Sequence, residues 1–187
     1  IAHLDGMSEC VVFDPGFEPQ PILDYLTEKG LSLAAILNTH GHADHIAGNA
    51  ALKEAWPEAP LVIGQGDAAK LTDPMLNLSG QYGMEMVSPA ADILVNAGQI
   101  YQSAGFDLEV RDTPGHSCGH VVFVWHDASP AVVFGGDVLF QRSIGRTDFP
   151  DGSFEQLVES IQTQLFVLPD DSIILPGHGP ATTIGEE

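Results

Sequence analysis

The residues best suited to chemistry lie in the stretch THGHADH, which places three histidines and an aspartate one or two positions apart. They are His40, His42, Asp44 and His45, and they directly follow the apolar run LSLAAIL and Asn38. Imidazole nitrogens and carboxylate oxygens bind zinc and related divalent metals, and they also transfer protons in catalysis. The alternative is a solvated polar loop, but a cluster of this composition is more typical of a metal site.

Three further candidate ligands occupy similar places in the sequence. His116 follows FDLEVRDTPG, Asp137 follows AVVFGG, and His178 follows DSIILPG. Each of these segments predicts an apolar strand, and glycine at a strand end allows a sharp turn and a close approach of the backbone. If the strand ends lie on one edge of a sheet, these ligands converge with the first cluster, and four unrelated polar loops become the weaker interpretation.

The elements that must position these residues alternate between helix and strand at first and are mainly strands later. Strands are predicted over residues 9–16, 31–39, 59–64, 98–105, 106–113, 120–127 and 131–137, with a last strand running into a loop over 171–180. Helices are predicted over residues 19–30, 45–57, 66–71 and 153–168. Residues 72–89 lack a clear period and predict an irregular loop. The pattern favours an α/β fold with two sheets covered by helices.

Composition limits the classes of protein and of partner. Six Lys and Arg residues against 26 Asp and Glu give a net charge of −20, so a nucleic acid or an anionic membrane is not an expected partner. No apolar run approaches the length of a membrane span, and no signal peptide is evident. Two cysteines make no disulfide framework, which favours a cytoplasmic location.

Four motifs together carry a resemblance to a known family. THGHADH, TPGHSCGH, GGDVLF and LPGHGP, in this order, resemble the motif set of the metallo-β-lactamase superfamily over nearly the whole chain. GDVLFQRSIGRTDFPDG and LPGHGPATTIGEE are most similar to glyoxalase II (hydroxyacylglutathione hydrolase) and its single-domain relatives. The resemblance implies an αββα sandwich, one domain over residues 1–187, and a dinuclear metal site at the edge of two sheets. It also implies that an N-terminal strand and a short C-terminal segment are missing.

The resemblance further implies two metal ions, each held by three residues and joined by one carboxylate. The expected ligands are His40, His42 and His116 for the first ion, Asp44, His45 and His178 for the second, and Asp137 as the bridge. Asp44 and Asp137 are the carboxylates assigned to catalysis. Zinc is the expected metal, with iron or manganese as alternatives, and two such ions can share a hydroxide nucleophile at neutral pH.

The expected reaction is hydrolysis of a small-molecule thioester, because a thiolate leaves without help from a general acid. Lactones and activated esters are alternative substrates. A second alternative is a persulfide dioxygenase with a single iron held by His40, His116 and Asp137, because NTHGHADHIAG and GRTDF resemble that class as well. The resemblance makes Arg146 a substrate-binding residue, although Asp148 places a negative charge beside it where the family has a tyrosine. A monomer or a small homo-oligomer is expected.

The remaining histidines and cysteines are not predicted as ligands. His3 and His126 are expected at the surface, and His120 is expected to form a structural hydrogen bond behind the site. Cys10 is expected in the core, and Cys118 in a loop position that other small residues would serve equally well.

Overall fold

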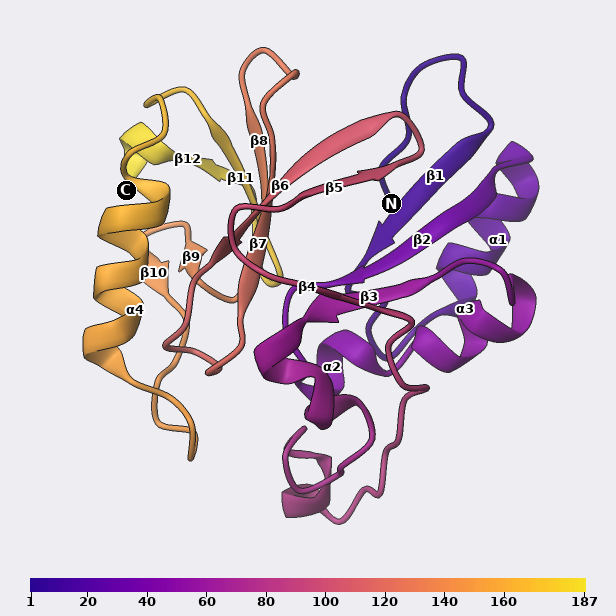
Figure 1. Cartoon of the computed structure of the whole chain (residues 1–187), viewed down its shortest axis with the longest axis horizontal. Coiled ribbons are helices and arrows are strands. Elements are labelled where there is room, and N and C mark those ends of the chain that lie inside the picture. The colour runs from indigo at the N-terminus through magenta and orange to yellow at the C-terminus, as the bar shows by residue number, and fades with distance from the viewer. The chain divides into compact units, whose positions relative to one another are not determined.

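The computed structural model describes residues 1–187, and the chain divides into two compact units whose elements are labelled in Figure 1. The N-terminal unit comprises Ile1–Ile63, Asp67–Leu94 and Gln102–Gly105, and the C-terminal unit comprises Gly64–Gly66, Val95–Tyr101 and Phe106–Glu187. The units interleave along the chain, and the single domain over residues 1–187 stays a prediction. None of the helices is long and apolar enough to cross a lipid bilayer.

The N-terminal unit is built on a four-stranded sheet. Its strands lie in the order β1 (Glu9–Phe13), β2 (Ser32–Asn38), β3 (Leu61–Gly64) and β4 (Ile93–Val95). β2 pairs in parallel with both β1 and β3, so each connection must cross over the sheet. The crossovers contain α1 (Gln20–Lys29) before β2, and α2 (Ala43–Ile46) and α3 (Asn49–Ala55) after it. All ligands predicted in THGHADH therefore lie where β2 ends and its crossover begins.

The core of this unit explains why its strands are nearly continuous apolar runs. Leu26 of α1 and Leu52 of α3 are fully buried in one cluster with Val12, Ile36 and Ile63 of the sheet. Figure 1 shows α1 and α3 on the same side of the β1–β3 strands. Strands of a parallel sheet are covered by their crossover helices, and apolar side chains are favoured on them for that reason.

The C-terminal unit contains a six-stranded sheet and a two-stranded ribbon. The sheet has the order β12 (Thr182–Thr183), β11 (Ile173–Pro176), β8 (Val132–Gly136), β7 (Val121–Trp125), β6 (Phe106–Asp112) and β5 (Ile100–Ser103). The ribbon pairs β9 (Leu139–Phe140) with β10 (Ser143–Ile144). β11 and β8 are parallel, so their carboxyl ends lie at the same edge. A helical segment, α4 (Phe154–Ser160) followed by the π-helix η3 (Ile161–Leu165), buries Leu157 and Leu165 against this sheet.

The two longest helices predicted after β2, over residues 45–57 and 153–168, differ from the structure. The helix expected over residues 45–57 is two short helices, α2 and α3, separated at Ala47 and Gly48. Gly48 lies against the turn after β1, where a Cβ atom would come 2.8 Å from the Cβ of Pro15, so this position has no room for a side chain. The helix expected over 153–168 begins as predicted, with the Ser153 side chain accepting from the Gln156 amide, but changes to π geometry at Ile161.

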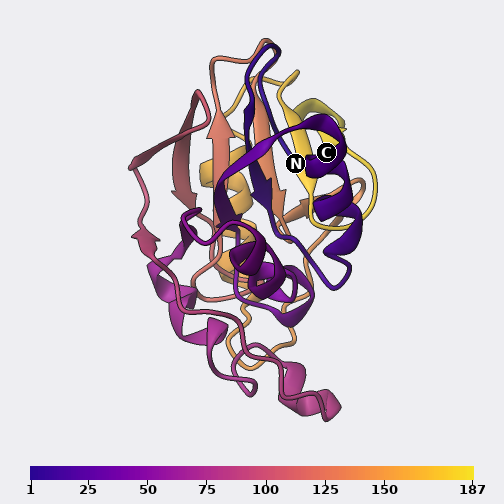
Figure 2. The same cartoon turned by 90° about the vertical axis from the view of Figure 1, so that its right-hand side faces the viewer.

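The irregular segment over residues 72–89 is confirmed apart from one short 3₁₀ helix, η2 (Ser79–Tyr82). Figures 1 and 2 both show this magenta segment projecting away from the β1–β4 sheet. Its base is fixed, because the buried Asn77 side chain donates to the carbonyls of Lys70 and Met86. The Asn77 carbonyl in turn accepts from the amide of Ala43, the first residue of α2.

Several short elements were missed by the prediction. The strands β4, β9, β10 and β12 have two or three residues each, which is too few to show a two-residue period. The segment expected as a helix over 66–71 is the 3₁₀ helix η1 (Gln65–Leu71), and a last 3₁₀ turn, η4, covers Ile184–Glu186.

Candidate metal centre

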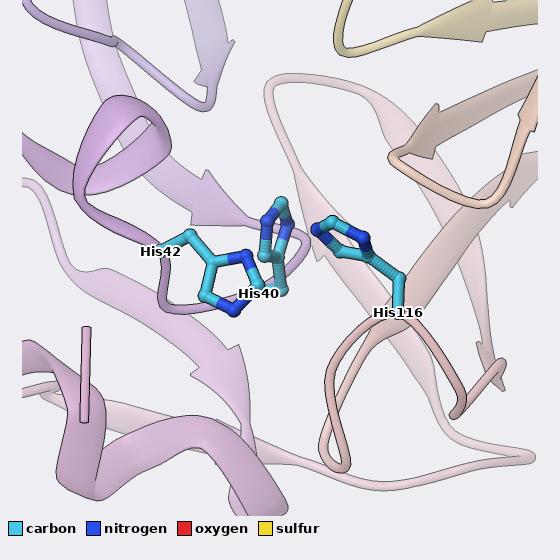
Figure 3. Close-up of side chains that lie close together, drawn as sticks. All are labelled: His40, His42 and His116. Atoms are coloured by element: carbon cyan, nitrogen blue, oxygen red, sulfur yellow. The ribbon is translucent and has the colours of Figure 1, made fainter. Parts of the chain in front are cut away.

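The histidines of the N-terminal unit lie at the carboxyl end of β2. His40 and His42 follow the strand, and Figure 3 shows both side chains close to its end. His42 is the residue before α2 and has an extended backbone, and the first turn of α2 carries Asp44 and His45. His40, His42 and His45 are at most 3% exposed, whereas the Asp44 side chain is 40% exposed. Burial of three imidazoles is costly unless hydrogen bonds or a metal compensate it.

The structure brings these four residues together. The ring centroid of His40 lies 4.6 Å from that of His42 and 4.0 Å from that of His45. Asp44 Oδ2 lies 3.6 Å from His45 Nε2. The first predicted cluster is therefore a compact group of imidazoles with one carboxylate at its margin.

Hydrogen bonds assign the tautomers of two of these histidines. The Asp14 carboxylate lies 3.1 Å from His45 Nδ1 through Oδ2, and a carboxylate only accepts, so this nitrogen donates. Thr39 Oγ1 donates to the same Asp14 oxygen at 2.7 Å and lies 3.0 Å from His40 Nδ1. Because the hydroxyl proton is used on Asp14, His40 Nδ1 must donate to the hydroxyl. In their neutral forms both rings therefore carry the lone pair on Nε2, the nitrogen that can bind a metal.

Asp14 was missed by the sequence interpretation, which included it in the strand predicted over residues 9–16. It has a positive φ of 41° and also accepts from the backbone amide of Thr39 at 2.8 Å. A carboxylate oxygen of Asp14 and one ring nitrogen each of His40 and His45 lie within 4.8 Å of one another, which is close enough for a common ion. The hydrogen bond to His45 Nδ1 favours a supporting role for Asp14 instead.

A buried ion pair supports the backbone between the first two histidines. Asp67 and Lys70 of η1 are 0% and 5% exposed, and Lys70 Nζ lies 3.1 Å from Asp67 Oδ1. The other oxygen of Asp67 accepts from the Gly41 amide at 2.8 Å. The position of Gly41 between His40 and His42 is therefore tied to η1.

The remaining predicted ligands lie in the C-terminal unit, each at the end of a strand. His116 lies in the loop after β6, as Figure 3 shows, Asp137 follows β8, and His178 follows β11. Residues Pro176 and Gly136 are register partners in the parallel pair of β11 and β8, so Asp137 and His178 leave the sheet side by side. Asp137 Oδ2 lies 3.6 Å from Nε2 of both His116 and His178. His178 is the most exposed of the three, at 58% of its side chain.

The tautomers of two histidines in this unit are also fixed. His116 Nδ1 lies 2.8 Å from the Arg146 carbonyl, which can only accept, so the neutral His116 ring has its lone pair on Nε2. His120 shows the opposite arrangement, because its Nε2 accepts from the Asp137 amide at 3.1 Å. His120 Nδ1 must then donate to Thr113 Oγ1 at 2.9 Å. The prediction of His120 as a structural hydrogen-bonding residue is confirmed.

Arg146 is linked to the same loop but is engaged by its neighbour. Its guanidinium donates to both oxygens of Asp148, at 2.6 and 2.7 Å, and lies 4.4 Å from the ring centroid of Phe149. The hydrogen bonds from Arg146 lower the pKa of the Asp148 carboxyl. Phe149 also lies edge-on to His116, with ring centroids 5.5 Å apart. Arg146 is therefore joined to the candidate ligand His116 through its carbonyl, and its guanidinium, predicted to bind substrate, is paired with a carboxylate.

The other histidines and cysteines lie where the sequence predicted them. His3 and His126 are exposed, and His126 Nε2 is 2.6 Å from Glu109. Cys10 is fully buried, and burial raises the pKa of its thiol to about 11. Cys118 is exposed, and its amide donates to Asp151.

The donor set of each unit fits a divalent ion such as zinc or iron. The N-terminal unit offers imidazole Nε2 atoms and one partly exposed carboxylate, and the C-terminal unit offers two imidazoles around one carboxylate. Such mixed nitrogen and oxygen donors are typical of zinc and non-haem iron sites that keep positions open for water or substrate. Soft thiolate ligands are absent from both groups.

Comparison with known proteins identifies the family. The family model described as "Metallo-beta-lactamase superfamily" matches residues 4–178. The chain is 42% identical over 177 residues to "Probable metallo-hydrolase YqgX" of Bacillus subtilis, covering 94% of this chain and 82% of that protein. It is 38% identical over 186 residues to "Hydroxyacylglutathione hydrolase GloC" of Haemophilus influenzae, covering 98% and 86%.

Solved structures agree with this assignment. The chain superimposes on the crystal structure of the B3 metallo-beta-lactamase BLEG-1 with a TM-score of 0.93 and 37% identity, over 99% of this chain and 88% of that one. It matches TTHA1623, solved in a di-iron-bound form, with a TM-score of 0.81 and 33% identity over 94% and 84%. These matches confirm the predicted fold class, and the chain belongs to the metallo-β-lactamase superfamily.

Proposed function

We propose that this chain is a metal-dependent hydrolase that holds two divalent ions and cleaves thioesters. The observation that carries the proposal is the position of Asp137 Oδ2, 3.6 Å from Nε2 of both His116 and His178. A carboxylate oxygen has lone pairs for two ions, whereas each imidazole nitrogen has one. The relatives named as a metallo-hydrolase and a hydroxyacylglutathione hydrolase support the reaction class, and the relative solved with two irons supports the count.

In this proposal two ions are held by two sets of ligands, with zinc as the first candidate. The two sets are His40, His42 and His116, and Asp44, His45 and His178, with Asp137 in both. The fixed tautomers of His40, His45 and His116 support the assignment, because each presents Nε2 with its lone pair. Bound ions would supply a hydroxide nucleophile at neutral pH and a positive charge that polarises a carbonyl oxygen.

The protein's own residues favour a thioester over an ester or an amide. Every buried histidine and carboxylate of the two clusters is assigned either to an ion or, like Asp14 and His120, to holding a neighbour in place. No side chain of the clusters then remains to protonate a leaving group. A thiolate, whose conjugate acid has a pKa near the 8.5 of cysteine, leaves without protonation far more readily than an alkoxide or an amide anion.

Arg146 determines how well an anionic thioester such as S-lactoylglutathione is held. A free guanidinium forms a charge-assisted contact with a carboxylate, worth about 1.5–3 kcal/mol. Asp148 accepts from Nε and Nη2 of Arg146, which form one bidentate edge of the guanidinium, and competes there with such a substrate. The net charge of −20 opposes the approach of an anion as well. We therefore expect poor saturation by S-lactoylglutathione and comparable turnover of small neutral thioesters.

The test compares protein stripped by a chelator with the same protein reloaded with zinc, iron or manganese. Hydrolysis of S-lactoylglutathione, of a small neutral thioester and of its matched oxoester is followed alongside metal content per chain. We expect two ions per chain, hydrolysis that returns with the metal, and a faster thioester than oxoester. Full activity in stripped protein refutes the mechanism, and oxygen uptake matched to persulfide loss, with one iron per chain, would establish the dioxygenase instead. A rate on β-lactams above that on thioesters refutes the substrate class.

Two variants and a control test the substrate contact. Asp148→Asn removes the carboxylate that pairs with the guanidinium and should lower KM for S-lactoylglutathione, whereas Arg146→Ala should raise it. Neither should change KM for the neutral thioester. Lys29→Ala removes one positive charge from α1 and controls for the change in net charge. Equal effects of Arg146→Ala and Lys29→Ala would show that Arg146 acts only through the overall charge.

A further inference from the structure

The turn after β1, residues 14–16, contacts both ends of the segment 39–45, which carries the candidate ligands of the N-terminal unit. The Asp14 carboxylate contacts Thr39 just before His40, and it contacts His45 at the other end. The Gly16 amide donates to the His45 carbonyl at 3.3 Å. Because β1 and β2 are parallel neighbours, and Phe13 is the register partner of Leu37, the end of β1 necessarily lies beside the start of this segment.

We propose that Asp14 is the positioning residue that sets the tautomers of His40 and His45 together, and so prepares ligands of both ions at once. It acts on His45 directly and on His40 through the Thr39 hydroxyl. The inference rests on the proposed metal binding by these two histidines. Its new element is that one carboxylate outside both ligand sets couples them.

The coupling follows from proton counting. Asp14 Oδ2 receives both the Thr39 hydroxyl, at 2.7 Å, and His45 Nδ1, at 3.1 Å. Since the carboxylate has no proton to give, both partners must donate to it. The Thr39 hydroxyl has only one proton, so its contact with His40 at 3.0 Å requires Nδ1–H on His40. A change at Asp14 therefore reaches two rings, whereas a change at Thr39 reaches one.

The backbone at Asp14 supports a dedicated role. Its φ of 41° lies in the left-handed region, which costs a non-glycine residue of order 1–3 kcal/mol unless the surroundings hold it there. Asn and Asp adopt this region more readily than other residues with side chains. The side chain is 12% exposed, so its hydrogen bonds are largely shielded from water. Glycine would suffice if the turn required only this positive φ. Aspartate adds the three hydrogen bonds to the Thr39 amide, the Thr39 hydroxyl and His45.

Asp14→Asn is the sharpest variant, because it keeps the size and the backbone preference of the residue. If the amide oxygen faces the Thr39 amide, its NH₂ group faces the Thr39 hydroxyl and His45 Nδ1. His45 must then accept on Nδ1 and carry its proton on Nε2. The Thr39 hydroxyl also accepts from the new amide, turns its proton to His40 Nδ1, and drives His40 to the same tautomer. Thr39→Val removes only the relay, and Thr39→Ser restores the hydroxyl.

The primary measurement is the ¹⁵N chemical shifts of the imidazole nitrogens in metal-free protein. We expect Nδ1–H on His40 and His45 in the native chain, Nε2–H on both in Asp14→Asn, and loss of a fixed tautomer at His40 alone in Thr39→Val. The second measurement is zinc affinity in metal buffers. Loss of a hydrogen-bond partner behind a ligand typically lowers metal affinity about 10–100-fold. We expect a loss of zinc affinity in that range at both ions for Asp14→Asn and at one ion for Thr39→Val. Thr39→Ser should recover the native affinity.

Asp92→Asn is the matched control. Asp92 accepts from the Leu61 amide and from Lys53 in the same unit but has no contact with a candidate ligand. It should lower stability without altering a histidine tautomer or zinc affinity. Unchanged tautomers and zinc affinity in Asp14→Asn, or a stability loss alone that equals the control, would overturn the proposal. Native protein with both histidines in the expected tautomers but no affinity for zinc would instead refute the proposed function.

Discussion

Adding one methyl group at Gly41 should separate the two candidate ligands beside it, His40 and His42, from their support in η1. A Cβ atom there would lie 2.5 Å from Lys70 Cβ, 3.1 Å from Lys70 Cδ and 3.1 Å from the Asp67 carbonyl oxygen. The backbone of Gly41 does not have a positive φ, so the effect of Gly41→Ala is one of space alone. Lys70 Cβ is anchored to the backbone and cannot move aside as a flexible side-chain end would.

The magnitude follows from what must give way. Favourable carbon contacts lie at about 3.5–4.0 Å, so η1 or the Gly41 backbone must shift by roughly 1 Å. Overpacking of this kind costs about 1–3 kcal/mol. The shift also weakens the hydrogen bond from the Gly41 amide to the Asp67 carboxylate, which is of a class worth about 1.5–3 kcal/mol. Replacing glycine by alanine also lowers the conformational entropy of the unfolded chain, which stabilises the fold by about 0.4–1 kcal/mol. The free energy of unfolding should therefore fall by about 2–5 kcal/mol in total, or roughly 4–20 °C in Tm.

Thermal unfolding of the metal-free protein measures this loss directly, and metal content after dialysis reports the displaced histidines. Gly135→Ala is the matched control, because its Cβ would meet a methyl of Ile174 at 3.1 Å, and that side chain can adjust. We expect the control to lose less than half as much stability and to keep its metal. A Gly41→Ala protein with the Tm and metal content of the native chain would show that η1 does not constrain the ligand segment.

Three further predictions concern other parts of the chain. Elemental analysis after dialysis should show His178→Ala losing one ion, whereas Asp137→Ala weakens binding of both; equal losses would contradict a bridging carboxylate. Hydrogen bonds from the Leu61 amide and from Lys53 lower the pKa of Asp92 in the folded protein. The Asp92 carboxylate therefore stabilises the fold at pH values above its unfolded pKa of about 4. This stabilisation is lost as the pH falls through the lower pKa of the folded protein. Asp92→Asn should therefore be about 0.5–1 kcal/mol less stable in urea at pH 7, a modest value because the side chain is 46% exposed, and the difference should vanish in acid. A thiol reagent should label Cys118 in the folded protein but Cys10, whose burial raises its pKa to about 11, only on unfolding.

The sequence was informative about the candidate ligands because strand ends have a simple signature. An apolar run followed by glycine or threonine and a histidine or aspartate predicts both the strand and the place where its chemistry lies. The structure adds the register that the sequence could not supply. The pairing of Pro176 with Gly136 places His178 beside Asp137, although 41 positions of sequence separate them. The metal-binding roles themselves stay predictions.

The support of the ligands could not be predicted in the same way. Asp14 belongs to a DPG turn, and aspartate is common in turns for local reasons, so its residue type carried no signal. Its partner Thr39 lies 25 positions away and becomes a neighbour only because β1 and β2 pair in parallel. Gly48 likewise has an ordinary place in a helical pattern until the Pro15 turn packs against it. Long-range contacts of this kind override local propensity.

The acidic composition acquires a partial explanation from these contacts. The irregular segments around the ligands have backbone amides that no strand or helix pairs, and each such amide needs another acceptor when water is excluded. Carboxylates outside the ligand sets supply it in two places, which are Asp14 for Thr39 and Asp67 for Gly41. At the exposed Cys118, Asp151 accepts from the backbone amide in competition with water. A carboxylate is suited to this work because it only accepts and binds an amide more strongly than a neutral oxygen does. Segments that must stay irregular to present imidazoles are thus held in shape by negative charge, and this charge lies beside sites proposed to bind cations, where it also favours their binding.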